Sequence, residues 1–164
     1  MIIVLDTNVL MRAIFSDDQH GKNIMRLHNK GSISIVTSSC IDKEWTSIFR
    51  LMCCRIIDDT PPEDVVRDKN NWMRFIKTFV DFVGPLKRVH ITDVKKYSPD
   101  KDDDMFFQCA VCGNADMIIS YNSDHLNIFD NKYKNKQGKK IRVLSPYQAY
   151  IIISGKEKGI SVRY

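Results

Sequence analysis

The chain opens on an apolar run that ends abruptly at an acid. Ile2 to Leu5 contains no polar residue, which is the pattern of a strand buried on both faces in a parallel sheet. Asp6 follows at once, so we predict its carboxylate at the carboxyl end of that strand, where open α/β folds bind their ligands. Thr7 and Asn8 then give a helix-start signal. This stretch alone leaves open a plainer interpretation, in which Asp6 only begins the helix.

The same order, a short apolar run followed by a helical pattern, recurs along the chain. Further strands are expected at residues 34–37, 89–91, 115–120 and 141–144, and helices at 38–57 and 60–84, from about 104, and from 146. Strands that alternate with helices favour a parallel sheet covered on both faces. We therefore predict one domain over residues 1–164, an α/β fold built as a three-layer α/β/α sandwich with a central, mostly parallel sheet.

Composition narrows the functional classes. The 164 residues, 43% hydrophobic, are enough for a substantial core, and 25 basic against 20 acidic residues give a net charge of +5. This moderate basic excess permits a nucleic-acid partner without proving one. The N-terminal apolar run is too short for a signal peptide, and no stretch approaches the length of a membrane span. We therefore expect a cytoplasmic protein with no membrane partner and with free thiols at its five cysteines.

Three further acids fall where other strands end or the next helices begin. Glu44 lies one turn into the helix after the second strand, and Asp104 begins a helix after a run of acids at 100–104. Asp124 follows the strand at 115–120, two residues after Asn122, and both side chains can offer oxygen to one cation. Each acid also has a structural interpretation as a helix cap or a partner of the helix dipole. Crowded acids repel one another unless they are solvated or meet a cation.

The carboxyl ends of parallel strands share one edge of a sheet, which predicts that the four acids Asp6, Glu44, Asp104 and Asp124 converge there. Carboxylates without cysteine or histidine partners select a hard cation, Mg²⁺ or Mn²⁺, over zinc. Such ions bridge phosphate oxygens and activate water, singly or in pairs. The chemistry expected of this edge is therefore phosphodiester hydrolysis.

These segments, taken in order, resemble the PIN-domain ribonucleases, most closely the VapC-like toxin components of bacterial and archaeal toxin–antitoxin pairs. The resemblance rests on five stretches: Val4 to Leu10; Ser38 with Glu44; Asp100 to Phe106; Ala115 to Ser120 with Asn122 and Asp124; and Leu144-Ser145-Pro146.

What the resemblance implies is a Mg²⁺- or Mn²⁺-dependent endoribonuclease with RNA as its substrate, and it leaves open an antitoxin protein as partner, a toxin role and a homodimer. Asp6, Glu44 and Asp104 become the acidic catalytic and metal-binding residues, with Asp124 at or near the fourth position. The supporting residues are Thr7 and Ser120, which orient the carboxylates, together with their neighbours Asn8, Asp103 and Asn122.

Two departures from the family pattern leave choices open. Many relatives carry an acid where Asn122 stands, so either Asp124 takes over as ligand or the fourth position is weakened. The choice between Asp103 and Asp104 also stays open; Asp104 is favoured because it keeps the family's distance to the apolar helix residues that follow.

Two other functions compete with the endoribonuclease. The first is a catalytically weak or inactive PIN module that binds RNA or a protein partner, since Asn122 is compatible with a decayed site. The second is a structure-specific DNA nuclease, which we disfavour because the chain lacks room for the extra DNA-clamping elements of such enzymes.

Overall fold

A five-stranded parallel sheet runs through the part of the chain that the computed structural model describes, which is residues 1–61, 64, 69–92, 95–98, 100–122 and 133–157. The strand order is β3-β2-β1-β4-β5, and every neighbouring pair is parallel. The strands are β1 (Ile2–Leu5), β2 (Ser34–Thr37), β3 (Lys87–Arg88), β4 (Met117–Ile119) and β5 (Arg142–Leu144).

Strand β1 occupies the centre of this sheet, as its unbroken apolar sequence predicts. Ile3, Val4 and Leu5 are completely buried. On one side Ile3 pairs with Ile35 of β2, and on the other with Met117 of β4. A strand with a neighbour on both sides and helices over both faces has no surface on which a polar side chain would be solvated.

The chain reverses its direction of travel across the sheet between β1 and β4. It moves outward from β1 to β2 and β3, then returns across the sheet to β4 and continues to β5. Neighbouring strands at such a reversal send their following segments to opposite faces, which leaves a crevice at their carboxyl ends. The backbone N–H of Asp6 donates to the carbonyl of Ile119 at 2.9 Å, so both strands end at this point.

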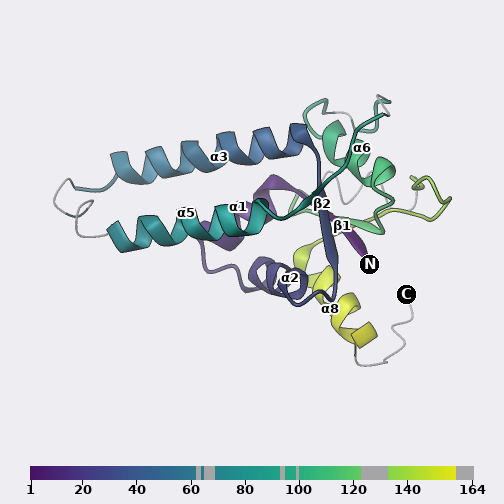
Figure 1. Cartoon of the computed structure of the whole chain (residues 1–164), viewed down its shortest axis with the longest axis horizontal. Coiled ribbons are helices and arrows are strands. Elements are labelled where there is room, and N and C mark those ends of the chain that lie inside the picture. The colour runs from purple at the N-terminus through teal and green to yellow at the C-terminus, as the bar shows by residue number, and fades with distance from the viewer. Residues whose placement is uncertain (62–63, 65–68, 93–94, 99, 123–132, 158–164) are drawn as a thin grey trace.

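Helices cover both faces and confirm the three-layer α/β/α arrangement (Figure 1). Helix α6 packs on β1 and β4, whereas α2 lies on the other side of the strands and packs against α1 and α8. The helices are α1 (Thr7–Phe15), α2 (Gln19–Asn29), α3 (Ser39–Asp58), α5 (Lys69–Val83), α6 (Asp104–Cys112) and α8 (Pro146–Glu157).

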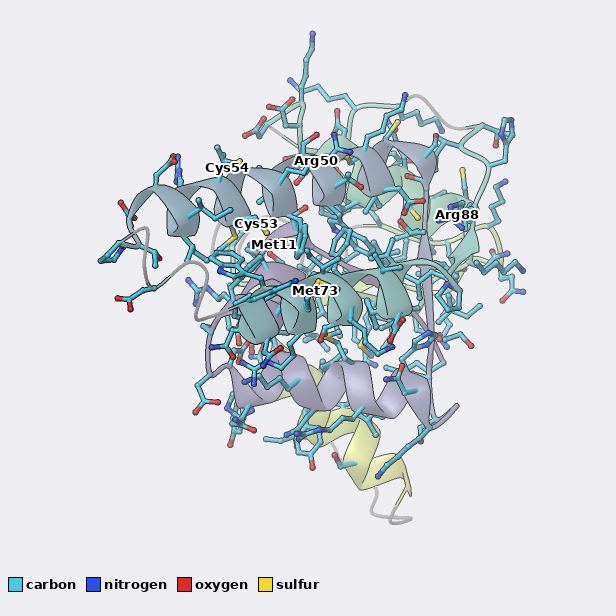
Figure 2. All side chains as sticks on the ribbon, turned by 60° about the vertical axis from the view of Figure 1, so that its left-hand side comes forward. Met11, Arg50, Cys53, Cys54, Met73 and Arg88 are labelled. Atoms are coloured by element: carbon cyan, nitrogen blue, oxygen red, sulfur yellow. The ribbon has the colours of Figure 1, made fainter. Side chains whose placement is uncertain are left out.

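The two long helices α3 and α5 lie side by side and extend beyond the sheet (Figure 1). Aromatic rings join them: Phe49 of α3 stacks on Phe79 of α5 at 4.2 Å between ring centroids, and Phe15 of α1 contacts Phe49 at 5.2 Å. Trp45 and Phe79 are buried, as expected of core residues. The outer face of the pair is exposed, and Figure 2 shows Arg50 on α3 and Met73 on α5 there.

The position of strand β3 differs from the sequence-based prediction. The expected strand at 89–91 is wrong, because β3 comprises residues 87–88, whose register is set by pairing with Val36 and Thr37 of β2. Only the backbone N–H of Val89 still contacts β2, at 2.7 Å from the carbonyl of Thr37. Of the helix expected at 60–84, the described residues show α5 from Lys69 to Val83 and a helical residue at Asp64, and residues 62–63 and 65–68 lie outside the described residues.

Two general expectations can be compared with the described residues. All five cysteines are free thiols. None of the helices in the described ranges combines the length and the apolar character that crossing a lipid bilayer requires.

Candidate carboxylate site

Asp6 lies at the carboxyl end of β1 and is almost fully buried, with 6% of its surface exposed. Its Oδ2 accepts hydrogen bonds from the Ser120 hydroxyl and, at 2.8 Å, from the side-chain amide of Asn8. Its Oδ1 accepts from the Asn8 backbone N–H at 3.4 Å, which makes Asp6 the N-cap of α1. Asp6 therefore begins the helix, as the plainer interpretation expects, while hydrogen bonds fix its carboxylate at the strand junction.

Asn8 and Ser120 tie the end of β1 to the end of β4. The Oδ1 atom of Asn8 accepts from the backbone N–H of Tyr121 at 3.1 Å. The Oγ atom of Ser120 accepts from the backbone N–H of Asn122 at 2.8 Å while its hydroxyl donates to Asp6. Because these bonds connect segments more than 110 residues apart, the orientation of the Asp6 carboxylate depends on both strands.

Glu44, on α3, faces the same junction. Its Oε1 atom accepts a hydrogen bond from the hydroxyl of Thr7, the residue after Asp6. Burial raises the pKa of Glu44 above its ordinary value, and the negative charges of Asp6, Asp103 and Asp102 raise it further, against the lowering effect of the Thr7 hydrogen bond. Three other acids therefore lie near enough to Glu44 to disfavour its ionised form.

A neighbouring acid on α3 has a different environment. Asp42 accepts from Arg88 Nε at 2.6 Å and from the Thr37 hydroxyl at 2.7 Å, and Arg88 is labelled in Figure 2. Its charge is thereby neutralised within the protein. Glu44 forms no ion pair with any residue in the described ranges. Of these two acids, only Glu44 adds uncompensated negative charge to the strand junction.

The acids at the start of α6 separate into two kinds. Asp104 is buried, and its Oδ1 accepts from the backbone N–H groups of Tyr97 and Ser98 at 2.7 and 2.6 Å. One of its oxygens therefore holds the loop before α6. Asp103 is half-buried and lines a hollow together with Glu44. The remaining residues around that hollow are Ile48, Asp102 and Met105.

Only one of the two candidates for the fourth ligand lies within the described residues. Asn122 is held near the junction by its backbone bond to Ser120. Asp124 lies outside the described residues. The choice between these two side chains as the fourth ligand therefore stays a prediction.

The donor chemistry of the junction fits a hard divalent cation. Asp6, Glu44 and Asp103 supply only carboxylate oxygens, which suit Mg²⁺ or Mn²⁺. Within the described ranges no three His, Cys, Asp or Glu side chains are drawn close enough together to coordinate one ion. The described carboxylates bring negative charge to one place, and Glu44 uses one of its oxygens, Oε1, to accept from the Thr7 hydroxyl.

Two residues beside this junction escaped the sequence-based prediction. Arg12 of α1 lies over the ring of Tyr121, with its Cζ atom 4.6 Å from the ring centroid. The only available signal was the spacing of Asn8 and Arg12, which places them on the same face of a helix one turn apart. Their meeting with Tyr121 depends on the pairing of β1 with β4.

An α/β/α sandwich with carboxylates at a strand reversal defines the class of domain. A family model described as "PIN domain" matches residues 2–124, which is 123 of the 164 residues, and the chain therefore belongs to the PIN-domain family. PIN domains are generally nucleases.

The fold is also similar to a solved structure whose title is "Crystal structure of VapBC2 from Rickettsia felis bound to a DNA fragment from their promoter". One chain of it superposes with a TM-score of 0.51 at 15% sequence identity, covering 87% of this chain and 98% of that chain. At this identity the likeness concerns the fold. A comparison with curated proteins found no match.

Proposed function

We propose that this PIN domain is a Mg²⁺- or Mn²⁺-dependent endoribonuclease that hydrolyses phosphodiester bonds of RNA. The observation that carries the proposal is the gathering of Asp6, Glu44 and Asp103 at the carboxyl edge of the sheet, where burial, and then the charges of the neighbouring acids, raise the pKa of Glu44. Carboxylates gathered at a ligand-binding edge support a site for cations and for the phosphates that cations bind.

Each side chain has a role in this proposal. Asp6 and Glu44 hold the ion, Ser120 and Asn8 fix the Asp6 carboxylate, and Thr7 orients Glu44. A divalent ion, when bound, supplies charge that neutralises the phosphodiester and lowers the pKa of an attacking water. The half-buried Glu44, with its raised pKa, can accept a proton more readily than an ordinary carboxylate at the same pH.

For the third acid we propose Asp103, although the sequence pattern favoured Asp104. The charge of Asp103 acts on Glu44, whereas one oxygen of Asp104 is used by two backbone N–H groups of the preceding loop. In this proposal Asp104 fixes the start of α6, and Asp103 is presented from it. The fourth position belongs to Asp124 or Asn122.

The fold is consistent with a role as the toxin of a toxin–antitoxin pair in the cytoplasm, with an antitoxin protein as partner. The similarity to a chain of VapBC2 supports this part of the proposal, since that structure is described as bound to DNA from its own promoter. A homodimer belongs to the same hypothesis. Co-expression with the product of a neighbouring small reading frame, followed by co-purification, tests the partner.

The enzymatic proposal is tested with purified protein and end-labelled RNA in Mg²⁺ or Mn²⁺, with and without a chelator. We expect the wild type to cut RNA, and both the chelator and Asp6→Asn to abolish cutting while the melting curve stays cooperative. Asparagine at position 6 is a suitable change because it can still accept the hydrogen bonds from Ser120 and Asn8.

The opposite result has a definite meaning. If the wild type and Asp6→Asn bind RNA equally and neither cuts it, the chain is a non-catalytic RNA-binding module. If labelled DNA is cut in preference to RNA, the substrate part of the proposal is wrong.

A further inference from the structure

A cation held over an aromatic ring lies beside the carboxylate junction. The guanidinium of Arg12 lies over Tyr121, 4.6 Å from Cζ to the ring centroid. The Tyr121 hydroxyl donates to Asp18 Oδ1 at 2.8 Å, which fixes the ring in place.

Backbone connections place this pair next to the proposed active site. Asn8 donates to the Asp6 carboxylate with its amide nitrogen and accepts from the Tyr121 backbone with its amide oxygen. Arg12 follows Asn8 by one helical turn, a rise of about 6 Å along α1. Asn8 therefore separates the carboxylates from a positive charge on the same helix face.

The Arg12 side chain is exposed and has no hydrogen bond or ion pair within the described part of the chain. Asp18, whose Oδ1 accepts from Tyr121 and, at 3.2 Å, from the backbone N–H of His20, forms no ion pair with Arg12 within the described residues. The attraction between a guanidinium and a ring face holds the group flat. Its N–H edges then remain available to a ligand.

We propose that Arg12, held flat by Tyr121, binds a backbone phosphate of the RNA strand beside the phosphodiester that is cleaved. This inference rests on the proposed function and names the residue that positions the substrate. A guanidinium matches phosphate oxygens with two parallel hydrogen bonds, which makes phosphate the favoured ligand. The neighbouring carboxylates repel the RNA backbone, so a cation one turn away offsets that repulsion along the path of the strand.

The chain contains a matched control for this contact. Arg74 lies over Phe75 with its Cζ atom 5.5 Å from the ring centroid, and Arg74 is also exposed. This second pair belongs to α5 and lines a groove formed with the end of α1 and with α2, which contains none of the proposed active-site residues. Removing Arg74 changes the net charge as much as removing Arg12 does.

The test measures RNA binding without cleavage. Fluorescence anisotropy of a short labelled single-stranded RNA is recorded at several salt concentrations, in the Asp6→Asn background. Arg12→Ala should weaken binding about tenfold and reduce the slope of log affinity against log salt by about 0.7, the value for one phosphate contact on a single strand. The RNA affinity of Arg12→Lys should lie between those of the Asp6→Asn parent and Arg12→Ala, because lysine keeps the charge and loses the planar fork.

Variants of the ring separate positioning from general charge. Tyr121→Leu should weaken binding about as much as Arg12→Ala, since the guanidinium loses the surface that holds it. Tyr121→Phe should have a smaller effect, because the ring remains and only the bond to Asp18 is lost. Arg74→Ala should leave both the affinity and the salt slope close to the parent values. In the cleaving protein, Arg12→Ala should raise KM more than it lowers kcat.

Each outcome supports or overturns the inference. If Arg12→Ala and Arg74→Ala weaken binding equally, or if neither does, the inference is wrong, and the proposed nuclease function stands provided the wild type cuts RNA. If the Asp6→Asn protein does not bind RNA at all, the inference fails as well. If RNA binding depends on Arg12 but the wild type never cleaves, the inference holds and the catalytic proposal fails.

Discussion

Asp116, at the amino edge of the sheet, and Glu44, at the carboxyl edge, have pKa values shifted in opposite directions. At the amino edge, Asp116 precedes β4 and accepts from the Ile2 backbone N–H at 2.8 Å and from the Lys139 ammonium group. Burial would raise the pKa of Asp116, yet the bonds to Lys139 and Ile2 outweigh that effect and the pKa is lowered. At the carboxyl edge, Glu44 has a raised pKa among other acids.

This difference separates acids that are paired with a basic side chain from acids that lie near one another. Asp116 at the amino edge is paired with Lys139, and Asp42, which follows β2 at the carboxyl edge, is paired with Arg88. The acids around Glu44 oppose one another, and such an arrangement costs stability unless a cation is bound. Asp116 at the amino edge is therefore paired within the protein, whereas the surroundings of Glu44 at the carboxyl edge are suited to an external cation.

Glu44→Gln gives the largest expected effect. The substitution keeps the size of the side chain and its acceptor for Thr7 while removing one negative charge from the carboxyl edge. We expect cleavage to fall by about a thousandfold, or ~4 kcal/mol of activation free energy. Initial rates with labelled RNA measure this loss, and Lys139→Met, at the amino edge, is the control. Near-wild-type cleavage by Glu44→Gln would break the contrast between the edges.

Asp104→Ala and Asp103→Ala separate the two acids at the start of α6. Asp104→Ala leaves the buried N–H of Ser98 and the N–H of Tyr97 without their acceptor, which should lower the free energy of unfolding by about 2 to 3 kcal/mol. Asp103→Ala should change it by less than about 0.5 kcal/mol while reducing cleavage. Urea denaturation and RNA cleavage assays measure the two quantities. A folded, stable Asp104→Ala protein that has lost activity would return Asp104 to the role of metal ligand.

Manganese should stabilise the protein through the carboxyl edge alone. At ten times its dissociation constant, Mn²⁺ should add about 1.4 kcal/mol to the free energy of unfolding and raise Tm by about 3 to 6 °C. Asp6→Asn should show little of this shift, whereas Lys139→Met should keep it. Differential scanning calorimetry with and without Mn²⁺ measures both, and equal shifts in all three proteins would indicate that the ion binds elsewhere.

The contributions of Glu44 and Asp116 to stability should change with pH in opposite directions. Because the folded-state pKa of Glu44 is raised, the folded state binds its proton more tightly, and stability falls as pH rises through the ordinary value toward the raised one. Glu44→Gln should remove this loss. The pKa of Asp116 is lowered, so its contribution is present above its ordinary pKa and is lost as pH falls through the lowered one.

These pH effects are the smallest of the four effects predicted in this comparison. Glu44 is half-exposed, and the Asp116–Lys139 pair lies near the surface, where such pairs contribute about 1 kcal/mol or less. Urea denaturation of the wild type, Glu44→Gln and Lys139→Met between about pH 2 and pH 7 measures both effects, because the Asp116 contribution is lost only below its ordinary pKa. If the wild type and Glu44→Gln change in stability identically across this range, the pKa of Glu44 is not raised in the folded state.

Local patterns predicted most of the fold. The apolar run before Asp6 identified the central strand, and Ser38 identified the start of α3, where its hydroxyl accepts from the Ile41 N–H at 3.4 Å. The location of β3 was missed, since a two-residue edge strand is defined by its neighbour's register and carries almost no sequence signal of its own.

The roles within the site were less accessible to sequence. Asp103 and Asp104 are adjacent acids of the same type, and no local pattern states which one meets backbone N–H groups and which one faces Glu44. The distinction depends on the loop at 97–98, which folds back on the start of α6. The contact between Arg12 and Tyr121 was hidden for the same reason, because 109 positions separate them along the chain.

The sequence by itself determined the layers of the fold and the residue types at the ends of its strands, since hydrophobic periodicity and helix-start signals act over a few neighbouring residues. Only the tertiary structure decided which charges surround each acid, because a carboxylate's pKa depends on burial and on charges brought close by strand pairing. Asp116 and Glu44 are both acids beside a strand or helix start in the sequence, and the fold gives one a lysine and the other more acids.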